Sequence, residues 1–346
     1  MATAVLPDTT RALYPFKQRF LALSDGQRMH YVDEGPPEGE PLVFLHGYPM
    51  WSFAYRALIV YYAALGYRCV AMDHIGYGLS DKPTSRSYHT LRRHIHNVME
   101  CLTTLDLRGV TLIMEDWGTT FGLGYAVRRS ENIRRLVIMN SWVFQDTFDY
   151  RVPALMRLVT WPGVGELLLG ALNLAFPLGL QRWTARQLSA GVMMAYRAPF
   201  REARQRTALV QFPRMISRSP THPSAGMMRE IEGGLNALHK TPALIVWGQD
   251  DPIFPPELAR HWKGALPRAR GPHFIAGGRH FLTEDDPDGL TLLLDAFLAE
   301  TSTAESTSDL SGPVTRESQP PRQVTSAPVR PADTGVTSSS PGVKRG

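Results

Sequence analysis

The chain has 346 residues, 43% of them hydrophobic and 20% charged, which suits one large soluble domain or one domain with an insertion. Its formal net charge of +5 comes from 37 basic and 32 acidic residues without a basic run, which argues against a nucleic-acid-binding protein. We expect no signal peptide and no transmembrane helix, because the N-terminus lacks a charged and an apolar region and no long apolar run occurs. Cys69 and Cys101 are expected to be buried thiols of a cytoplasmic protein.

The first 140 residues alternate short apolar runs with helix-like segments. Residues 17–24 and 28–34 predict two strands joined by a turn. Four further strands are predicted by "PLVFLHG", "GYRCVAMD", "GVTLIMED" and "IRRLVIMN", and helices by residues 91–105 and 119–129. Continuous apolar runs are typical of strands that are buried on both faces of a parallel sheet.

The second half of the chain changes in composition twice. Residues 141–225 are helix-like, rich in Arg, Leu, Met and Trp, and repeatedly interrupted by proline, which indicates an insertion of short helices. The strand pattern returns with "TPALIVWG" and "GPHFIAG". Residues 301–346 contain 26 Ser, Thr, Pro or Gly residues and no aromatic residue, so we expect a disordered tail. The predicted organisation is a core of residues 1–140 and 226–300, a helical cap of residues 141–225, and the tail.

Polar residues follow directly after the predicted strands. In an α/β sheet, functional side chains gather at the carboxyl ends of the strands. The residues at these places are His46, Asp73, Asp116, Asn140, Asp250 with Asp251, and His280. The chain order of Asp116, Asp251 and His280 follows the order nucleophile, acid, histidine of the α/β-hydrolases.

The stretch "LIMEDWGTT" places Asp116 at the turn where many hydrolases carry a serine nucleophile. The absence of a serine there argues against a serine esterase. A carboxylate is already ionised at neutral pH and needs no base to act as a nucleophile. The simpler interpretation is that Asp116 only caps the following helix.

Eight stretches in order resemble the haloalkane dehalogenase family of the α/β-hydrolase superfamily, over about residues 15–298. They are "FLHGYPMWSFAYR", "DHIGYGLSDKP", "EDWG", "VIMNSW", "AYRAPF", "FPRMI", "WGQDDP" and "GGRHF". The resemblance implies a mostly parallel eight-stranded sheet flanked by helices, with an inserted helical cap. The chain resembles the branch of this family whose catalytic acid follows the seventh strand. The other branch has a carboxylate after the sixth strand, where this chain has Asn140.

The resemblance also implies a two-step reaction. Asp116 would displace halide from a carbon atom and form an ester, which water activated by His280 would hydrolyse. Asp251, chosen over Asp250 by the family's Gly-x-x-Asp spacing, would orient His280. Trp117 would bind halide through its indole N–H, and the backbone of Trp117 and Tyr48 would hold the oxyanion. The implied partners are a small apolar halogenated substrate and water, with no cofactor and no metal, in a monomer or weak dimer.

Two positions depart from the family pattern. Tyr48 stands where dehalogenases often have an Asn that helps to hold halide, and Thr119 stands where Gly is common. The second halide donor stays open among three tryptophans, Trp142, Trp161 and Trp183.

Three other functions remain open. Epoxide hydrolases use the same three catalytic residues with cap tyrosines, for which Tyr150 and Tyr196 are available. A β-lactone decarboxylase would have much the same sequence. A pseudoenzyme that uses the fold for binding is the non-enzymatic alternative.

Overall fold

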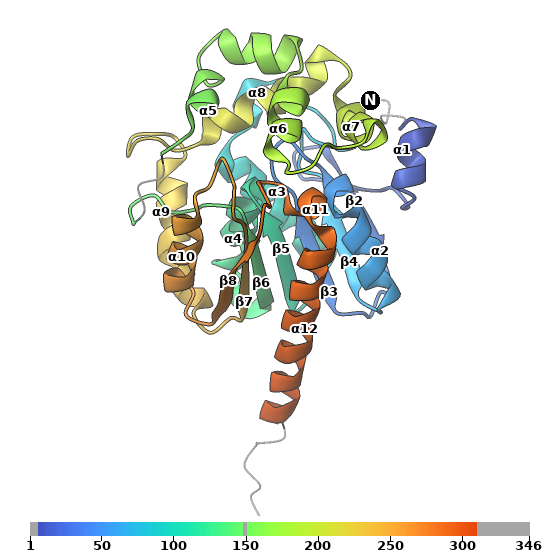
Figure 1. The fold of residues 1–346 in the computed structure, drawn as a ribbon, viewed down its shortest axis with the longest axis vertical. Helices are drawn as coiled ribbons and strands as arrows, with labels where there is room; N and C mark the ends of the chain where they lie inside the picture. The colour runs from blue at the N-terminus through green and yellow to red at the C-terminus, as the bar shows by residue number, and fades with distance from the viewer. Residues whose placement is uncertain (1–5, 148–150, 310–346) are drawn as a thin grey trace, which may run out of the picture. The chain divides into compact units, whose positions relative to one another are not determined.

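The fold was taken from a computed structural model that describes residues 6–147 and 151–309. Its centre is one eight-stranded sheet with the strand order β1-β2-β4-β3-β5-β6-β7-β8 (Figure 1). The strands β3 to β8 run parallel to one another, whereas β2 pairs antiparallel with both β1 and β4. The predicted mostly parallel sheet of eight strands is therefore confirmed.

The strands coincide with the apolar runs of the sequence. The central strands β3, β5 and β7 are buried almost throughout, as expected for strands covered on both faces. The strand bounds are β1 Arg19–Ala22, β2 Arg28–Glu34, β3 Pro41–Leu45, β4 Arg68–Met72, β5 Val110–Glu115, β6 Ile133–Met139, β7 Ala243–Gly248 and β8 Ala269–Ile275. Cys69 in β4 and Cys101 in α3 are buried and unpaired, as predicted.

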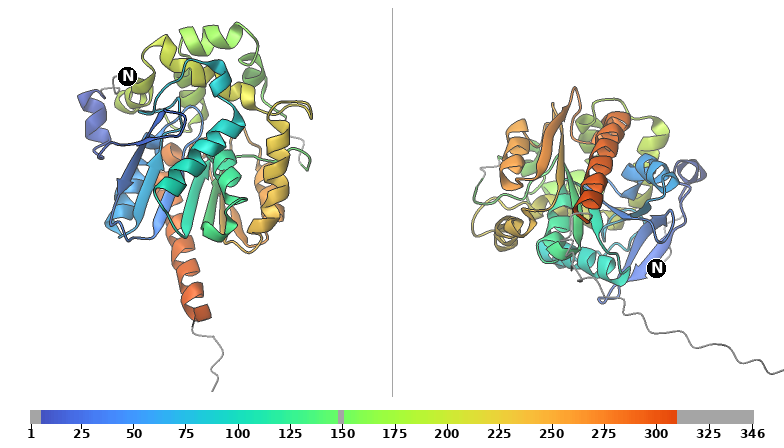
Figure 2. Two further views of the ribbon diagram at one scale, coloured as in Figure 1. Left: turned by 180° about the vertical axis from the view of Figure 1, so that it is seen from behind. Right: turned by 90° about the horizontal axis from the view of Figure 1, so that it is seen from below.

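Helices cover both faces of the sheet. The helices α3 and α4 lie on one face, and α2 lies on the other (Figures 1 and 2). The hydroxyls of Tyr61 and Tyr62 in α2 donate to Asp295 in α12, which joins these two helices. The helices outside the insertion are α1 Asp8–Leu13, α2 Arg56–Ala64, α3 Leu91–Thr104, α4 Trp117–Ala126, α9 Ala225–Gly234, α10 Pro256–Ala265, α11 Leu282–Asp285 and α12 Pro287–Asp309.

The helical insertion, residues 141–225, joins β6 to α9 and lies beyond the carboxyl ends of the strands (Figure 1). Its α-helices are short because prolines and glycines interrupt it. They are α5 Ala154–Leu158, α6 Gln181–Trp183, α7 Ala190–Arg197 and α8 Thr207–Gln211, with π-helical segments at Glu166–Ala171 and Ala175–Leu180. The compact unit of residues 1–302 includes the insertion.

The C-terminal helix extends beyond the predicted start of the tail. Residues 301–309 were expected to be disordered, but α12 continues to Asp309. The Thr301 and Ser302 hydroxyls donate to the carbonyls of Phe297 and Leu298 one turn earlier, so both hydroxyls have hydrogen-bond partners within the helix. The rest of the predicted tail lies outside the described residues.

A buried arginine, Arg135, connects the sheet to the C-terminal helix. Arg135 in β6 is fully buried, and its guanidinium contacts the Glu40 carboxylate. It also donates to the Thr301 hydroxyl and, over 2.9 Å, to the Ser302 hydroxyl. Arg135 therefore joins β6 to both α12 and the segment before β3.

We expect Arg135→Met to lower the free energy of unfolding by about 3 kcal/mol, because it removes the charge-assisted hydrogen bonds of a buried guanidinium to Glu40, Thr301 and Ser302. Urea denaturation measures the change. Arg129→Met is the control, since the Arg129–Glu131 pair is exposed and should contribute less than about 1 kcal/mol. Equal losses in the two variants would contradict the role given to Arg135.

Candidate active site

Asp116 lies at a strained turn between β5 and α4. Its backbone angles are φ 49° and ψ −123°, a conformation that a non-glycine residue adopts only when its surroundings impose it. A Cβ atom at Gly118 would lie 2.0 Å from the Leu45 carbonyl oxygen, and one at Gly47 would lie 2.6 Å from Asp116 Cβ. Glycine is therefore required on both sides of the turn that presents the carboxylate.

Two backbone N–H groups point at the Asp116 carboxylate. The N–H of Tyr48 donates to Asp116 Oδ2 over 2.8 Å, and the N–H of Trp117 is a second donor to the carboxylate. His46 supports the loop of Tyr48, because its ring accepts from the His74 N–H over 3.1 Å. These donors could also stabilise an oxyanion that forms on the Asp116 carboxyl group.

His280 and Asp251 form a buried pair. The distance between His280 Nδ1 and Asp251 Oδ2 is 3.0 Å. The other oxygen, Asp251 Oδ1, accepts from the Ile253 N–H over 2.7 Å, so the carboxylate is held at both ends. Asp250 is exposed, whereas Asp251 is 8% exposed. Of the two adjacent aspartates, the structure brings only Asp251 to the histidine.

The charges of the site influence one another. Burial raises the pKa of Asp116, against the opposing effects of His280 and the N–H groups of Tyr48 and Trp117. Burial alone would lower the pKa of His280, but the carboxylates of Asp251 and Asp116 outweigh it and raise this pKa to about 9. An imidazole with this pKa is protonated at neutral pH.

The structure shows a positioning role for Asn140 that its place after the sixth strand did not predict. Its side-chain NH₂ donates to the carbonyls of Arg279 and His280 over 2.7 and 2.8 Å, and its Oδ1 accepts from the Gly248 N–H over 2.8 Å. Asn140 thus fixes the loop of His280 to the ends of β6 and β7. Asn140 directly follows the buried strand β6, and its φ of 33° is positive, which is uncommon for a residue other than glycine.

Glu115 is a second residue whose place only the structure reveals. It precedes Asp116, is fully buried, and accepts from the Leu282 N–H over 3.3 Å, while its Oε2 has no hydrogen-bond partner. Burial raises the pKa of Glu115 to about 8, so this carboxyl group is mostly neutral at pH 7.

Asp116 and His280 open into one apolar cavity, which has an empty volume of about 350 Å³ that is partly open to solvent. The strand ends contribute the polar groups, and the helical insertion contributes apolar walls. The cavity is lined by Tyr48, Asp116, Trp117, Trp142, Met156, Trp183, Ile216, Ile253, Phe254 and His280. An apolar cavity with a few convergent polar groups is the usual form of a small-molecule site.

The four tryptophans considered for halide binding differ in their position relative to the cavity. Trp117, Trp142 and Trp183 line the cavity, whereas Trp161 is 60% exposed and does not. Trp183 also holds the loop of the histidine, because its carbonyl accepts from the backbone N–H of His280 over 2.9 Å. Thr119 is buried in α4, and its hydroxyl has no hydrogen-bond partner.

Of the two tyrosines considered as acids, the structure describes Tyr196. Tyr196 is buried, does not line the cavity, and donates to Glu284 over 2.5 Å. Glu284 in turn pairs with Arg56, so this network joins the insertion to the core. Tyr150 lies outside the described residues.

In the described part of the chain, no group of three or more His, Cys, Asp or Glu residues is arranged to hold a metal ion. Within the same residues, the helices are too short or too polar to cross a bilayer.

Residues 40–287 match the family model described as the alpha/beta hydrolase fold. Among curated proteins, the chain is 34% identical over 299 residues to a cis-3-alkyl-4-alkyloxetan-2-one decarboxylase of Shewanella oneidensis, covering 84% of this chain and 91% of that protein. It is also 34% identical over 281 residues to a haloalkane dehalogenase of Mycobacterium marinum, covering 79% and 90%.

Solved structures give the same placement. The haloalkane dehalogenase DbeA from Bradyrhizobium elkani superposes with a TM-score of 0.75 at 26% identity, covering 84% of this chain and 99% of that chain. The haloalkane dehalogenase DatA from Agrobacterium tumefaciens gives a TM-score of 0.71 at 27% identity, covering 82% and 97%.

The electrostatics of the site predict that Asp116→Asn lowers the pKa of His280 from about 9 by about one unit or more, because a nearby negative charge is removed. An NMR titration of the His280 ring measures this pKa. In the unaltered protein this pKa exceeds the ordinary value of about 6.5. The charged ring therefore stabilises the fold fully below about pH 6.5, and the contribution is lost as the pH rises through about 9. Asp250→Asn, at the exposed neighbour, should leave the pKa of His280 unchanged, and an equal pKa in all three proteins would refute the coupling.

Proposed function

The chain belongs to the α/β-hydrolase family, in the branch of haloalkane dehalogenases and oxetanone decarboxylases, and we propose that it hydrolyses carbon–halogen bonds. The observation that carries the proposal is the Asp116 carboxylate, presented by a strained turn into an apolar cavity that it shares with His280. A buried carboxylate that is poorly hydrated is a strong nucleophile for a saturated carbon atom.

In the first step, an Asp116 oxygen forms a bond to the carbon atom while the carbon–halogen bond breaks. The halide leaves with the bonding electron pair and requires no proton. The Tyr48 N–H fixes the orientation of the attacking carboxylate. The Trp117 indole N–H is the halide donor next to the nucleophile, and Trp142 and Trp183 are the candidates for the second donor.

In the second step, His280 removes a proton from water, and the hydroxide attacks the ester carbonyl of Asp116. The N–H groups of Tyr48 and Trp117 stabilise the tetrahedral oxyanion. Its collapse releases the alcohol, because protonated His280 returns the proton to the departing oxygen. Loss of one further proton from the Asp116 carboxyl group to solvent restores the carboxylate. Esterification removes the Asp116 charge that helps to raise the pKa of His280, so the ring is a better proton acceptor in the ester than it would be if Asp116 stayed charged. Asp251 stabilises the resulting imidazolium.

A β-lactone decarboxylase is the second candidate. One argument for it is that Tyr48 stands where dehalogenases often have an Asn whose side-chain amide helps to hold halide. The other is the similarity to the oxetanone decarboxylase. Asp116 would attack the ring carbon that bears the lactone oxygen, breaking that carbon–oxygen bond and leaving a free carboxylate. Loss of carbon dioxide would then form the carbon–carbon double bond and expel the Asp116 carboxylate. This route needs no halide site and no water.

Epoxide hydrolysis receives less support, because it needs an acid for the departing alkoxide. Tyr196, one of the two cap tyrosines considered for that role, is bonded to Glu284 away from the cavity. A pseudoenzyme is disfavoured by the intact set of Asp116, Asp251 and His280 around the cavity.

The two-step reaction predicts that His280→Ala, incubated with 1-bromobutane, accumulates a protein heavier by the butyl group, because the ester forms but is not hydrolysed. Intact-protein mass spectrometry and peptide mapping to Asp116 measure it. The control Asp116→Asn/His280→Ala should give no adduct at this site. An adduct from a terminal epoxide, with no adduct from the bromoalkane, would reassign the chain to the epoxide hydrolases. Carbon dioxide and an alkene from a cis-disubstituted β-lactone would support the second candidate, and inertness toward all three would reject displacement by Asp116.

The halide site predicts that Trp117→Phe weakens iodide binding about tenfold, since a hydrogen bond to a charged group contributes about 1.5 kcal/mol or more. Isothermal titration calorimetry with sodium iodide measures it. Trp161→Phe is the matched control, because Trp161 is 60% exposed and away from the cavity. If both variants bind iodide equally well, Trp117 has no role in halide binding.

A further inference from the structure

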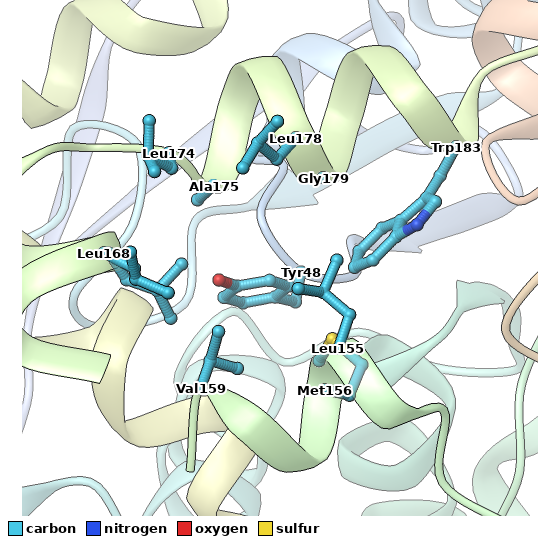
Figure 3. A pocket seen from close by; sticks show the side chains of 11 residues that line it. Tyr48, Leu155, Met156, Val159, Leu168, Leu174, Ala175, Leu178, Gly179 and Trp183 are labelled. Atoms are coloured by element: carbon cyan, nitrogen blue, oxygen red, sulfur yellow. The ribbon is translucent and has the colours of Figure 1, made fainter. Parts of the chain in front are cut away.

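A groove distinct from the active site is lined by residues of α3, α8 and α9 and of the segments next to them. Its empty volume is about 1350 Å³ and is partly open to solvent. It shares no lining residue with the active-site cavity or with the apolar cavity of the insertion that adjoins that site at Tyr48 (Figure 3). A ligand in the groove would therefore contact both the core and the insertion without touching Asp116 or His280.

The first turns of two helices line this groove. Their lining residues are Leu91 and Arg92 in α3 and Gly226 and Met227 in α9. The first N–H groups of a helix have no acceptor inside it, and they carry a partial positive charge. Neither first turn contains an acidic residue, and α9 has no side-chain cap. The two helix ends therefore offer N–H groups that an anion could bind.

Two polar side chains of the groove also lack a partner among the described residues. Gln211 in α8 is 9% exposed, and its amide Nε2 has no hydrogen-bond partner. A buried N–H without an acceptor is costly, so Gln211 favours an acceptor from outside the chain. Arg92 is exposed, and its guanidinium forms no ion pair with a described residue. A cation in the first turn of a helix is unfavourable unless an anion lies nearby.

The other charged side chains of the groove are paired within the protein. The Arg214 guanidinium donates to both carboxylate oxygens of Glu166 over 2.9 and 2.8 Å. The Glu230 carboxylate pairs with Arg128. Among the described residues that line the groove, Arg92 thus carries the one uncompensated charge, and this charge is positive.

The two histidines of the groove are uncharged. Both ring nitrogens of His89 lie within hydrogen-bond distance of a partner, one at 3.2 Å from a backbone carbonyl oxygen and one at 3.3 Å from the ring of His94. The His222 ring donates to the Arg214 carbonyl and accepts from the Ser224 N–H, each over 3.1 Å. Burial lowers the pKa of His222, and that of His89 to about 4. These rings therefore add neither positive charge nor free donors at pH 7.

The donors that remain come from three elements. They are the Arg92 guanidinium and the N–H groups of α3, the Gln211 amide of α8, and the N–H groups of α9. Donors on three elements suit a phosphate group, whose acceptor oxygens point in several directions, better than a planar carboxylate. The groove is larger than a phosphate ion, and part of its lining is apolar: Leu91, Met215, Pro223 and Met227. An organic group attached to the phosphate would contact this apolar part.

From these observations we propose that the groove lined by α3, α8 and α9 binds the phosphate group of a small organic phosphate through Arg92, Gln211 and the N–H groups of the two helix ends. The bound phosphate would connect α3 of the core to the helical insertion, to which Gln211 belongs. The site is independent of the reaction proposed for Asp116.

The test measures binding of phenyl phosphate to the full chain by isothermal titration calorimetry, with inorganic phosphate, benzoate and benzyl alcohol for comparison. We expect phenyl phosphate to bind at least about tenfold more tightly than the uncharged benzyl alcohol, because charge-assisted hydrogen bonds contribute about 1.5 kcal/mol or more. It should also bind more tightly than inorganic phosphate, which lacks the organic group. Absence of phenyl phosphate binding at millimolar concentration, or tighter binding of benzoate, would overturn the proposal.

Two exposed positions locate the site. Arg92→Gln should weaken phenyl phosphate binding about tenfold, since it removes a charged donor. Arg108→Gln is its control, because the Arg108 side chain is 82% exposed and does not line the groove. Gly226→Asp should abolish binding, because it places a negative charge among the donors. A Cβ atom at Gly226 would meet no atom within 4 Å, and the same holds for Gly233 on the same helix, outside the groove, so that Gly233→Asp is the matched control.

Gln211→Leu tests the buried donor and should weaken binding about fivefold, the effect of one hydrogen bond of about 1 kcal/mol. If this variant does not fold, the exposed positions 92 and 226 still provide the test. Weaker binding in Arg92→Gln and Gly226→Asp, but not in their controls, supports the phosphate site whether or not Asp116 forms an adduct. Equal binding in all four of these variants would place phenyl phosphate elsewhere and reject the proposal, while leaving the function proposed for Asp116 untouched.

Discussion

The burial of one carboxylate, that of Asp116, determines how the rest of the site is arranged. Removing a charged group from water has a high free-energy cost unless hydrogen bonds and opposite charge compensate for it. Here the N–H groups of Tyr48 and Trp117 and the nearby His280 provide this compensation. Glycine is required at position 47 because a Cβ there would meet the Asp116 side chain, and at position 118 because a Cβ there would meet the Leu45 carbonyl. The strained backbone of Asp116 is thus supported from several sides.

The helical insertion is part of this arrangement and does more than cover the site. The Trp183 carbonyl accepts a hydrogen bond from the backbone N–H of His280, so a residue of the insertion helps to position the loop of the candidate base. The network of Arg56, Glu284 and Tyr196 fixes the same insertion to the core through charge-assisted hydrogen bonds. Movement of the insertion would therefore change both access to the cavity and the orientation of the histidine.

Tyr48 contributes to the site through both its backbone and its side chain. Its backbone N–H makes the contact with Asp116 that any residue at this position could make, because the peptide group is the same for nearly all of them. Its side chain forms part of two cavity walls. Different atoms of Tyr48 thus contact Asp116 and line the cavity.

The sequence by itself determined the sheet and the order of its functional residues. Apolar runs mark strands because both faces of a parallel sheet are buried, and the residues after these runs identify Asp116, Asp251 and His280. Only the tertiary structure decided the roles of Asn140 and Glu115, the choice of Trp142 and Trp183 over Trp161 as cavity residues, and the end of α12. These depend on contacts between residues far apart in the chain, such as Asn140 with Gly248 and Arg135 with Thr301, which no local pattern records.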